Sequence, residues 1–263
     1  MQYQHLKFMT SPLSTPYQQV LHIHTDTEGT LIERPNRFLA IVEIEENGNK
    51  KQEKVHVHDP GRLIDVLYPG NRVLLRKADN PKRKTGWDMI AGKIGVNWIL
   101  INSAFHRQIS GWVIENGVVD ILSNADSILP EKKYGDSRLD YLILKEGKSI
   151  WVEVKGCTLA EGRIASFPDA PTTRGKRHLE ELIKARSEGH EAAVLILVLR
   201  PEAECFTANG IIDPAFAETF EKALEAGVKV FPLLFSFNDG VISYHCQLPL
   251  CDTILRQKIE TRT

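Results

Sequence analysis

Two strand-forming segments joined by a short turn constrain the fold of this chain most. Residues 138–144 (RLDYLIL) and 149–155 (SIWVEVK) are rich in apolar and β-forming side chains, and the four residues KEGK lie between them. If the central Glu-Gly forms a two-residue loop, the register places Asp140 directly opposite Glu153. Because alternate residues of a strand share a face, Lys155 points the same way as Glu153. The sequence therefore predicts a sheet face that carries two carboxylates and an amine.

Two opposed carboxylates need a positive partner. The Cβ atoms of directly opposite residues lie roughly 4.5–5.5 Å apart, and like charges at that distance destabilise a sheet. Mg²⁺ takes oxygen ligands and is typically held by one or two carboxylates plus substrate phosphate. We therefore expect Asp140 and Glu153 to hold Mg²⁺ or Mn²⁺, and Lys155 to orient or deprotonate a water or to stabilise charge on a phosphate.

These three side chains are the predicted catalytic residues of a metal-dependent nuclease. The alternative is that Glu153 and Lys155 are solvated residues on a half-exposed strand. A third metal carboxylate is expected from Glu131, which lies on the approach to the Asp140 strand, with Glu115 as the other candidate.

Composition leaves the class of partner open. The chain has 263 residues, of which 42% are hydrophobic and 25% charged, so it can form one large or two medium domains. Its formal net charge of −1 excludes a globally basic coat, so nucleic acid would have to bind to local basic patches.

The location is predicted to be the cytoplasm, without membrane association. The N-terminus from Met1 lacks the features of a signal peptide, and the longest apolar run, residues 192–199, is far shorter than the ~20 residues of a membrane helix. The four cysteines form no C-x-x-C pair and are expected to be reduced thiols. No oligomeric state is predicted.

The pattern of the chain changes near residue 95. Residues 1–95 alternate short strands with Gly- and Pro-containing turns, which predicts a small OB-like β-barrel. Residues 96–263 read as an α/β domain with a mixed central sheet between helices. The expected helices there are 98–109, 174–188 and one that Asp213-Pro214 opens and Gly227 closes; the expected further strands are 193–199 and 228–235.

Basic residues gather where a nuclease would need them. One cluster, residues 174–178, opens the helix after the motif strand, where the macrodipole favours phosphate. A second, residues 80–87, is a basic loop beside a tryptophan that could stack a base, or else a solvated surface loop. The predicted nucleic-acid contacts are Arg34, Arg37, Lys82, Arg83, Lys84, Trp87, Arg138, Arg174, Lys176, Arg177 and His178.

A weaker candidate is a zinc site. His22 and His24, and likewise His56 and His58, lie two residues apart on expected strands, a spacing that can bind zinc if the strands are neighbours. Alternating polar side chains on the wet face of a barrel explain them better.

Six strings together resemble the sugar fermentation stimulation protein A family. They are RPNRFLA (34–40), HDPGRL (58–63), NPKRKTGWD (80–88), SRLDY (137–141), EVKGCTL (153–159) and FPDAPTTRGKRHLEEL (167–182). The resemblance implies an OB-like domain joined to a PD-(D/E)xK nuclease-like domain, in a cytoplasmic protein that binds DNA without sequence specificity and is linked to the regulation of sugar, notably maltose, utilisation. Carried over by motif, Asp140 is the aspartate, and Glu153 and Lys155 are the E-x-K pair.

Two functions follow as hypotheses. The first is a Mg²⁺- or Mn²⁺-dependent nuclease acting on DNA or RNA at Asp140, Glu153 and Lys155. The second is a non-catalytic DNA-binding regulator of sugar metabolism that uses the same basic surfaces. Opposed carboxylates repel an anionic ligand unless a metal neutralises them, which favours the first.

Overall fold

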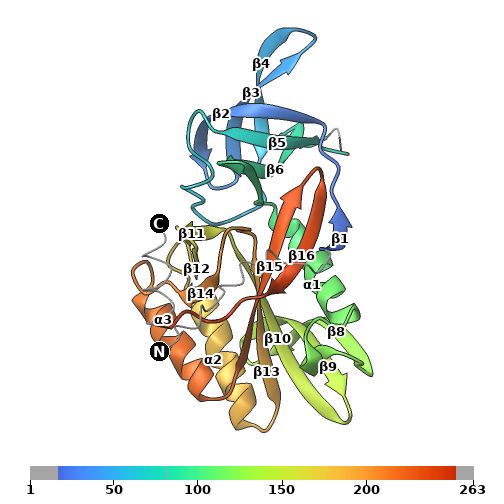
Figure 1. Ribbon diagram of the computed structural model, residues 1–263, viewed down its shortest axis with the longest axis vertical. Helices are drawn as coiled ribbons and strands as arrows, with labels where there is room; N and C mark the ends of the chain where they lie inside the picture. The colour runs from blue at the N-terminus through green and yellow to red at the C-terminus, as the bar shows by residue number, and fades with distance from the viewer. Residues whose placement is uncertain (1–16, 81, 253–263) are drawn as a thin grey trace, which may run out of the picture.

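The protein consists of a small barrel stacked on a larger α/β domain (Figure 1). The computed structural model describes residues 17–80 and 82–252. The barrel lies at the top of the view around one hydrophobic core, and the second domain lies below it with a core on each face of its sheet. The predicted fold class, an OB-like barrel followed by an α/β domain with a mixed central sheet, is confirmed.

Alternation of apolar and polar residues builds the barrel. Its strands are β2 (Thr27–Asn36), β3 (Leu39–Glu46), β4 (Asn49–His56), β5 (Arg72–Lys77) and β6 (Trp87–Ile94). They follow the order β4-β3-β2-β5-β6, and parallel pairing of β4 with β6 closes the ring. Inward-facing residues such as Leu31, Val42 and Leu75 are fully buried in the barrel core. The β3–β4 hairpin projects beyond the barrel (Figure 1).

The segment that connects the domains corrects one prediction. Residues 98–109 were expected to be helical, but β7 (Asn97–Leu100) is a strand that pairs with β6 and, through Trp98 and Phe237, with β15. Ile99 is buried in the barrel core and Leu100 in the core of the second domain. An apolar run covered on both sides has no amphipathic period, so periodicity cannot distinguish strand from helix there. After a short 3₁₀ turn, η1 (Ser103–Phe105), the helix α1 (His106–Glu115) follows.

The second domain has a mixed sheet. Its strands are β1 (Gln18–His22), β8 (Ser127–Tyr134), β9 (Ser137–Lys145), β10 (Lys148–Cys157), β13 (Glu191–Val198), β15 (Lys229–Asn238) and β16 (Val241–Gln247). They run in the order β1-β16-β15-β13-β10-β9-β8, with β10, β13 and β15 parallel and the outer pairs antiparallel.

Helices cover both faces of this sheet. The helix α1 packs on one face, and α2 (Thr173–Ser187) and α3 (Pro214–Glu225) pack on the other (Figure 1). Successive residues of β13 alternate between the two cores: Leu195 faces the α1 side and Val194 the α2–α3 side. This double burial explains why the strand is apolar throughout.

The predicted helices α2 and α3 are confirmed, and their caps explain where they begin. The side chain of Thr172 accepts a hydrogen bond from Gly175 N at the start of α2, and that of Asp213 accepts one from Phe216 N at the start of α3. A smaller sheet of β11 (Leu159–Glu161), β12 (Ile164–Phe167) and β14 (Cys205–Ala208) lies beside α3, and a 3₁₀ turn, η2 (Asp120–Leu122), precedes β8.

The cysteine prediction is wrong for one pair. Cys205 and Cys251 form a disulfide across a sequence separation of 46 residues, while Cys157 and Cys246 are free thiols. The two half-cystines lie far apart in the sequence without a recognisable spacing, so the prediction of four reduced thiols had no signal against it. The bridge ties the segment after β16 to the start of β14.

None of the helices in the described part of the chain is long and apolar enough to cross a membrane. The N-terminal segment from Met1, on which the absence of a signal peptide was predicted, lies outside the described residues.

Candidate active site

The predicted hairpin register is confirmed at the centre of the second domain. Strands β9 and β10 pair from Lys145 and Lys148 to Tyr141 and Val152. The two turn residues between them have positive φ angles of 51° and 74°, as a type I′ turn requires. The ladder ends one pair before Asp140 and Glu153, and Asp140 Oδ2 instead accepts a hydrogen bond of 2.7 Å from Val154 N.

Glu153 lies at the centre of a buried polar cluster. It is 2% exposed, and its Oε1 accepts hydrogen bonds from Lys155 Nζ at 2.5 Å and from His178 Nδ1. Because Arg174 Nε donates to His178 Nε2 at 3.3 Å, the imidazole carries its proton on Nδ1. Glu153 Oε2 is buried and has no hydrogen-bond partner among the described residues.

The pKa values of the two carboxyl groups are shifted in opposite directions. Burial, followed by the charge of Glu153, raises the pKa of Asp140 to about 7. Burial also opposes ionisation of Glu153, but Lys155 and His178 outweigh it and hold the pKa of Glu153 below its ordinary value. One carboxylate is thus fixed as an anion, and its neighbour exchanges a proton near neutral pH.

This donor set fits a hard divalent cation. A buried carboxylate oxygen without a partner beside a second carboxyl group is costly unless something positive binds there. Asp140 and Glu153 supply the oxygen ligands that Mg²⁺ and Mn²⁺ take. No group of three His, Cys, Asp or Glu side chains in the described ranges could hold a metal, so a cation here would complete its coordination with water or substrate oxygen.

The carboxylates open into a pocket of about 490 Å³ between the two domains. Arg37 and the loop 59–61 line it from the barrel, and Lys155, Thr172 and Arg174 line it from the second domain, together with Asp140 and Glu153. The site is therefore built by both domains.

The barrel side of the pocket is held by Arg34. Its guanidinium donates hydrogen bonds to the carbonyl groups of Arg37 at 2.7 Å, Gly61 at 3.0 Å and Arg62. Arg37 Nη1 donates to Pro60 O at 3.0 Å. Arg34, predicted to contact nucleic acid, thus uses its terminal nitrogens on the backbone of the loop, whereas Arg37 lines the pocket.

The same loop is fastened to the second domain. Asp169 Oδ2 accepts a hydrogen bond of 3.0 Å from Leu63 N, and Asp65 forms a 2.6 Å ion pair with the buried Arg200. A side chain at Gly61 would displace the carboxylates of Asp59 and Asp169, so glycine at this position allows the close approach. We call these two contacts, Asp169–Leu63 and Asp65–Arg200, the interdomain clamp.

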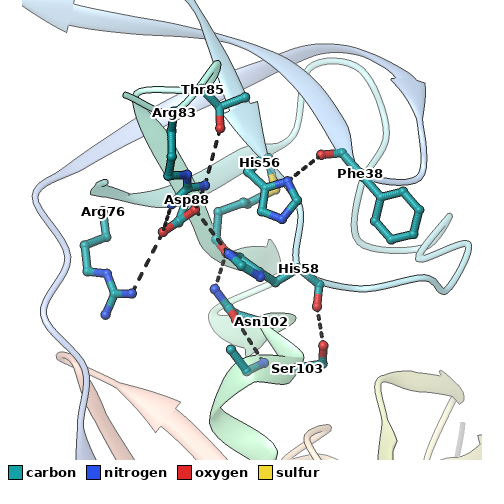
Figure 2. Close-up of polar contacts among 11 residues, drawn as sticks. Phe38, His56, His58, Arg76, Arg83, Thr85, Asp88, Asn102 and Ser103 are labelled. Carbon is teal, nitrogen blue, oxygen red and sulfur yellow. Dashed lines mark hydrogen bonds and ion pairs between the residues drawn. The ribbon is translucent and has the colours of Figure 1, made fainter. Parts of the chain in front are cut away.

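A polar network connects the barrel to η1, the 3₁₀ turn that leads into the second domain (Figure 2). Asp88 accepts two hydrogen bonds from Arg83, at 2.5 and 3.0 Å, and lies 3.2 Å from His58 Nε2. The carbonyl of His58 accepts hydrogen bonds from the backbone and the side chain of Ser103. Arg83, predicted to contact nucleic acid, is engaged here.

The other barrel residues that were predicted to bind nucleic acid or zinc differ in exposure and position. Trp87 is only 7% exposed and belongs to the barrel core, so its ring is covered rather than presented for stacking. Lys82 and Lys84 are exposed. The histidines do not gather: His56 and His58 are in ring contact at 4.1 Å in the barrel, while His22 lies on β1 in the other domain.

The structure places the remaining predicted residues around the pocket. Glu131 lines it but is 57% exposed and ion-paired with Arg107 at 3.1 Å and Arg138 at 3.7 Å. Glu115, the alternative, is exposed at the end of α1 and does not line the pocket. Lys176 pairs with Glu180 at 3.3 Å.

In the basic cluster at the start of α2, the arginines are accessible and the histidine is buried. Arg174 lines the pocket and Arg177 is exposed. His178, predicted to contact nucleic acid, is 2% exposed and turned inward onto Glu153. Its position in the first turns of an amphipathic helix puts it on the buried face, next to Leu179 and Leu182.

Sequence reasoning missed several lining residues. His106, at the start of α1, lies against the backbone of Gly156, where any side chain would overlap its ring. Burial, followed by the charge of Lys155, lowers the pKa of His106 to about 4, so the imidazole is neutral. Asp59 and Asp169 were also missed, although they lie within the strings HDPGRL and FPDAPTTRGKRHLEEL that carry the family resemblance.

Together, these features define a two-domain class of protein: an OB barrel that closes one side of a pocket in an α/β domain whose central hairpin carries two carboxylates and a lysine. Residues 32–101 match the SfsA N-terminal OB domain, and residues 104–240 match the Sugar fermentation stimulation protein RE domain. The chain belongs to the sugar fermentation stimulation protein family.

Its relatives extend over nearly its whole length. A sugar fermentation stimulation protein homolog from Methanococcoides burtonii is 58% identical and aligns over 88% of this chain and 95% of that protein. One from Thermotoga maritima is 38% identical over 89% and 99%. Among solved structures, Pyrococcus furiosus SfsA in complex with Ca²⁺ is 28% identical, with a TM-score of 0.82 over 89% of this chain and 100% of that one.

Proposed function

We propose that the protein is a nuclease that hydrolyses phosphodiester bonds at Asp140, Glu153 and Lys155 with Mg²⁺ or Mn²⁺. The observation that carries the proposal is the buried, unpartnered Oε2 of Glu153 beside a second carboxyl group, in a pocket that Arg37 and Arg174 line from opposite domains. The related Pyrococcus furiosus protein was solved with Ca²⁺, a hard cation that takes the same oxygen ligands.

Each residue has a task that its position allows. Asp140 and Glu153 would hold the cation, which when bound would polarise the phosphate and acidify a water. Lys155, whose amine lies beside Glu153 in the pocket wall, would orient the attacking water or neutralise charge on the phosphate. Arg174 and the N-terminal turn of α2 would receive the phosphate group.

His178 would act through Glu153. Its Nδ1–H donates to Oε1, and the opposite ring nitrogen is held by Arg174. This arrangement fixes the Glu153 carboxylate while Oε2 stays available, and it links the phosphate-receiving arginine to the metal-binding carboxylate. Glu131 could add a third carboxylate only by leaving its arginine partners.

Sequence-nonspecific binding of DNA, with RNA as a further substrate, completes the proposal. Exposed cations on both domains, Lys84, Arg138 and Arg177 among them, suit backbone contacts that carry no sequence information. We propose the cytoplasm as the place of action, although a disulfide is uncommon there outside hyperthermophiles.

A second candidate is a DNA-binding regulator of sugar metabolism that does not cleave. The relatives' shared name, sugar fermentation stimulation protein homolog, favours it. Such a protein would bind nucleic acid with steep salt dependence and would not need the carboxylates.

Cleavage assays separate the two. Labelled single-stranded, double-stranded and branched DNA and RNA would be incubated with the protein and Mg²⁺, Mn²⁺ or EDTA. The nuclease predicts metal-dependent cutting that falls at least about 100-fold in Asp140→Asn and Lys155→Ala. Lys148→Ala, which removes an exposed lysine at the other end of the same strand, is the matched control and should keep full activity.

Two results would reject the nuclease. One is the absence of cutting with any metal together with salt-sensitive binding, which supports the regulator. The other is cutting that survives in Asp140→Asn and Lys155→Ala, which would trace the activity to another site or to a contaminant.

A further inference from the structure

An exposed aromatic ring stands next to the pocket. Phe38, in the turn between β2 and β3, is 52% exposed; it lies outside the pocket lining, but its sequence neighbour Arg37 belongs to it. The turn is fixed: the carbonyl of Phe38 accepts hydrogen bonds of 3.0 Å from Val57 N and from His56 Nδ1. Figure 2 shows the phenyl ring pointing away from both histidines of the barrel network. An exposed aromatic side chain on an anchored backbone is a platform on which a nucleobase can stack.

Two arginines on opposite walls of the pocket have nitrogens that could bind phosphates. Arg174, on the second-domain wall, uses only Nε, for His178, and its two terminal nitrogens have no protein partner in the described part of the chain. Arg37, on the barrel wall, uses Nη1 for Pro60 O, and Nη2 has no such partner among the same residues. A chain of phosphates could therefore run from one wall to the other.

Most of the acidic lining is already engaged. Glu131 is paired with Arg107, Asp169 accepts the Leu63 N–H, and Asp59 accepts the Gly61 N–H at 2.6 Å. Burial and the nearby Asp169 also raise the pKa of Asp59 to about 6. Glu153 itself is paired with Lys155. Most acidic groups of the lining are therefore bonded to protein donors, which leaves the free arginine nitrogens to a phosphate.

The size of the pocket limits what can enter. The interdomain clamp holds the barrel loop across one side, and the volume of about 490 Å³ is that of a small-molecule site that is open to solvent on its other side. A double helix needs an open groove, and enzymes with snug pockets act on single strands or on extruded nucleotides. A single strand can place one or two nucleotides between the walls while its next base lies on the barrel.

We propose that the interdomain pocket binds single-stranded nucleic acid, with a base stacked on Phe38 and the adjacent phosphates on Arg37 and Arg174. The proposal rests on the function proposed above, for which it names the class of substrate. In this proposal the barrel distinguishes single strands from duplex. The carboxylates of the second domain then act on the bound single strand.

Binding measurements test this without cleavage. A short 5′-labelled oligonucleotide, alone or annealed to its complement, would be titrated with the full-length protein in Ca²⁺ and separately in EDTA, with fluorescence polarisation as the readout. Tighter binding of the single strand is expected. Phe38→Ala should weaken single-strand binding about 5- to 100-fold, the loss typical of one base–aromatic stack, and Phe38→Trp should retain it.

Tyr68→Ala is the matched control. Tyr68 is an aromatic residue of the barrel domain with a similar exposure, 48%, but neither it nor either of its sequence neighbours lines the pocket, so its removal should leave both affinities unchanged. Equal affinity for single strand and duplex would overturn the proposal. Equal losses in Phe38→Ala and Tyr68→Ala would overturn it as well, because binding would then not depend on the pocket.

The result can be separated from that of the nuclease test. If the protein cuts nucleic acid and Asp140→Asn does not, but Phe38→Ala leaves strand preference intact, only the present proposal fails. If no metal supports cutting while single-strand binding still depends on Phe38, the pocket is a single-strand binding site and the nuclease proposal fails alone.

Discussion

At the scale of single residues, the paired carboxyl groups store unfavourable electrostatic energy. Glu153 is held ionised by Lys155 and His178, so the neighbouring Asp140 can ionise only against a fixed negative charge. The hydrogen bond from Val154 N offsets part of this cost but not all of it. A site arranged this way binds a proton or a cation more readily than an isolated aspartate would, which is the behaviour expected of a metal ligand.

The first prediction concerns Asp140 and pH. The folded protein holds the Asp140 proton up to about pH 7, against an ordinary pKa of 3.8, so between these values the folded state binds more protons than the unfolded state. Stability from this group therefore falls as pH rises from about 4 to 7. Asp140→Asn removes the charge while its amide oxygen can still accept the Val154 N–H. In EDTA, its advantage over the wild type should grow by on the order of 2 kcal/mol between pH 5 and pH 8.

Urea denaturation at the two pH values would measure this difference. Other titrating groups are common to both proteins and cancel in the comparison. Asp136→Asn, at an exposed position just before the same strand, is the control and should follow the wild type at both pH values. A constant offset for Asp140→Asn would show that Asp140 has an ordinary pKa and is not under electrostatic strain.

How far the site could be predicted depends on how local its contacts are. Asp140, Glu153 and Lys155 lie on one hairpin, and the turn alone sets their register, so the sequence was sufficient to bring them together. His106 and Asp169 reach the pocket from α1 and from the loop before α2, through contacts that no local pattern encodes. Trp87 was expected on the surface because it follows a basic loop, but pairing of β4 with β6 turns it into the barrel core.

At the scale of elements, the same rule separates correct from incorrect predictions. The helices α2 and α3 begin where a capping side chain meets the backbone three residues later, a signal contained in a few residues. The strand β7 could not be recognised in this way, because its apolar faces contact different domains. The disulfide had no local signal at all, since its half-cystines meet only when the segment after β16 returns to β14.

The second prediction concerns this disulfide. Denatured without reductant, the protein should titrate two thiols, those of Cys157 and Cys246, and four after reduction. Because the bridge closes a loop of 46 residues, Cys251→Ser should lower the free energy of unfolding by roughly 2–4 kcal/mol. Cys246→Ser, at a free and partly exposed cysteine, is the control and should have little effect. Four reactive thiols before reduction would instead support the expectation from sequence.

At the scale of the whole molecule, function depends on how the two domains are held. The barrel contributes Arg37 and the loop 59–61 to the pocket, and the interdomain clamp fixes that loop against the second domain. Arg200 is the buried part of the clamp: it is 5% exposed and shared between Asp65 of the barrel domain and Glu202 of its own domain. This division provides a matched pair of variants, since each carboxylate can be neutralised separately.

The third prediction uses that pair. Asp65→Asn removes the ion pair that crosses between the domains, whereas Glu202→Gln removes one within the second domain, and both change the charge by the same amount. Each should cost on the order of 1–3 kcal/mol of stability, because Arg200 stays buried with one carboxylate fewer. Only Asp65→Asn should also loosen the barrel loop, so that duplex gains access and the ratio of duplex to single-strand affinity rises severalfold.

The polarisation assay measures that ratio, and small-angle X-ray scattering measures whether the domains separate. An increase in the radius of gyration for Asp65→Asn but not for Glu202→Gln would connect the change in strand preference to domain opening. If both variants shifted the ratio equally, the effect would belong to the Arg200 charge cluster rather than to the clamp. If neither shifted it, the pocket would select single strands through its own walls, with Phe38 and the two arginines as the remaining determinants.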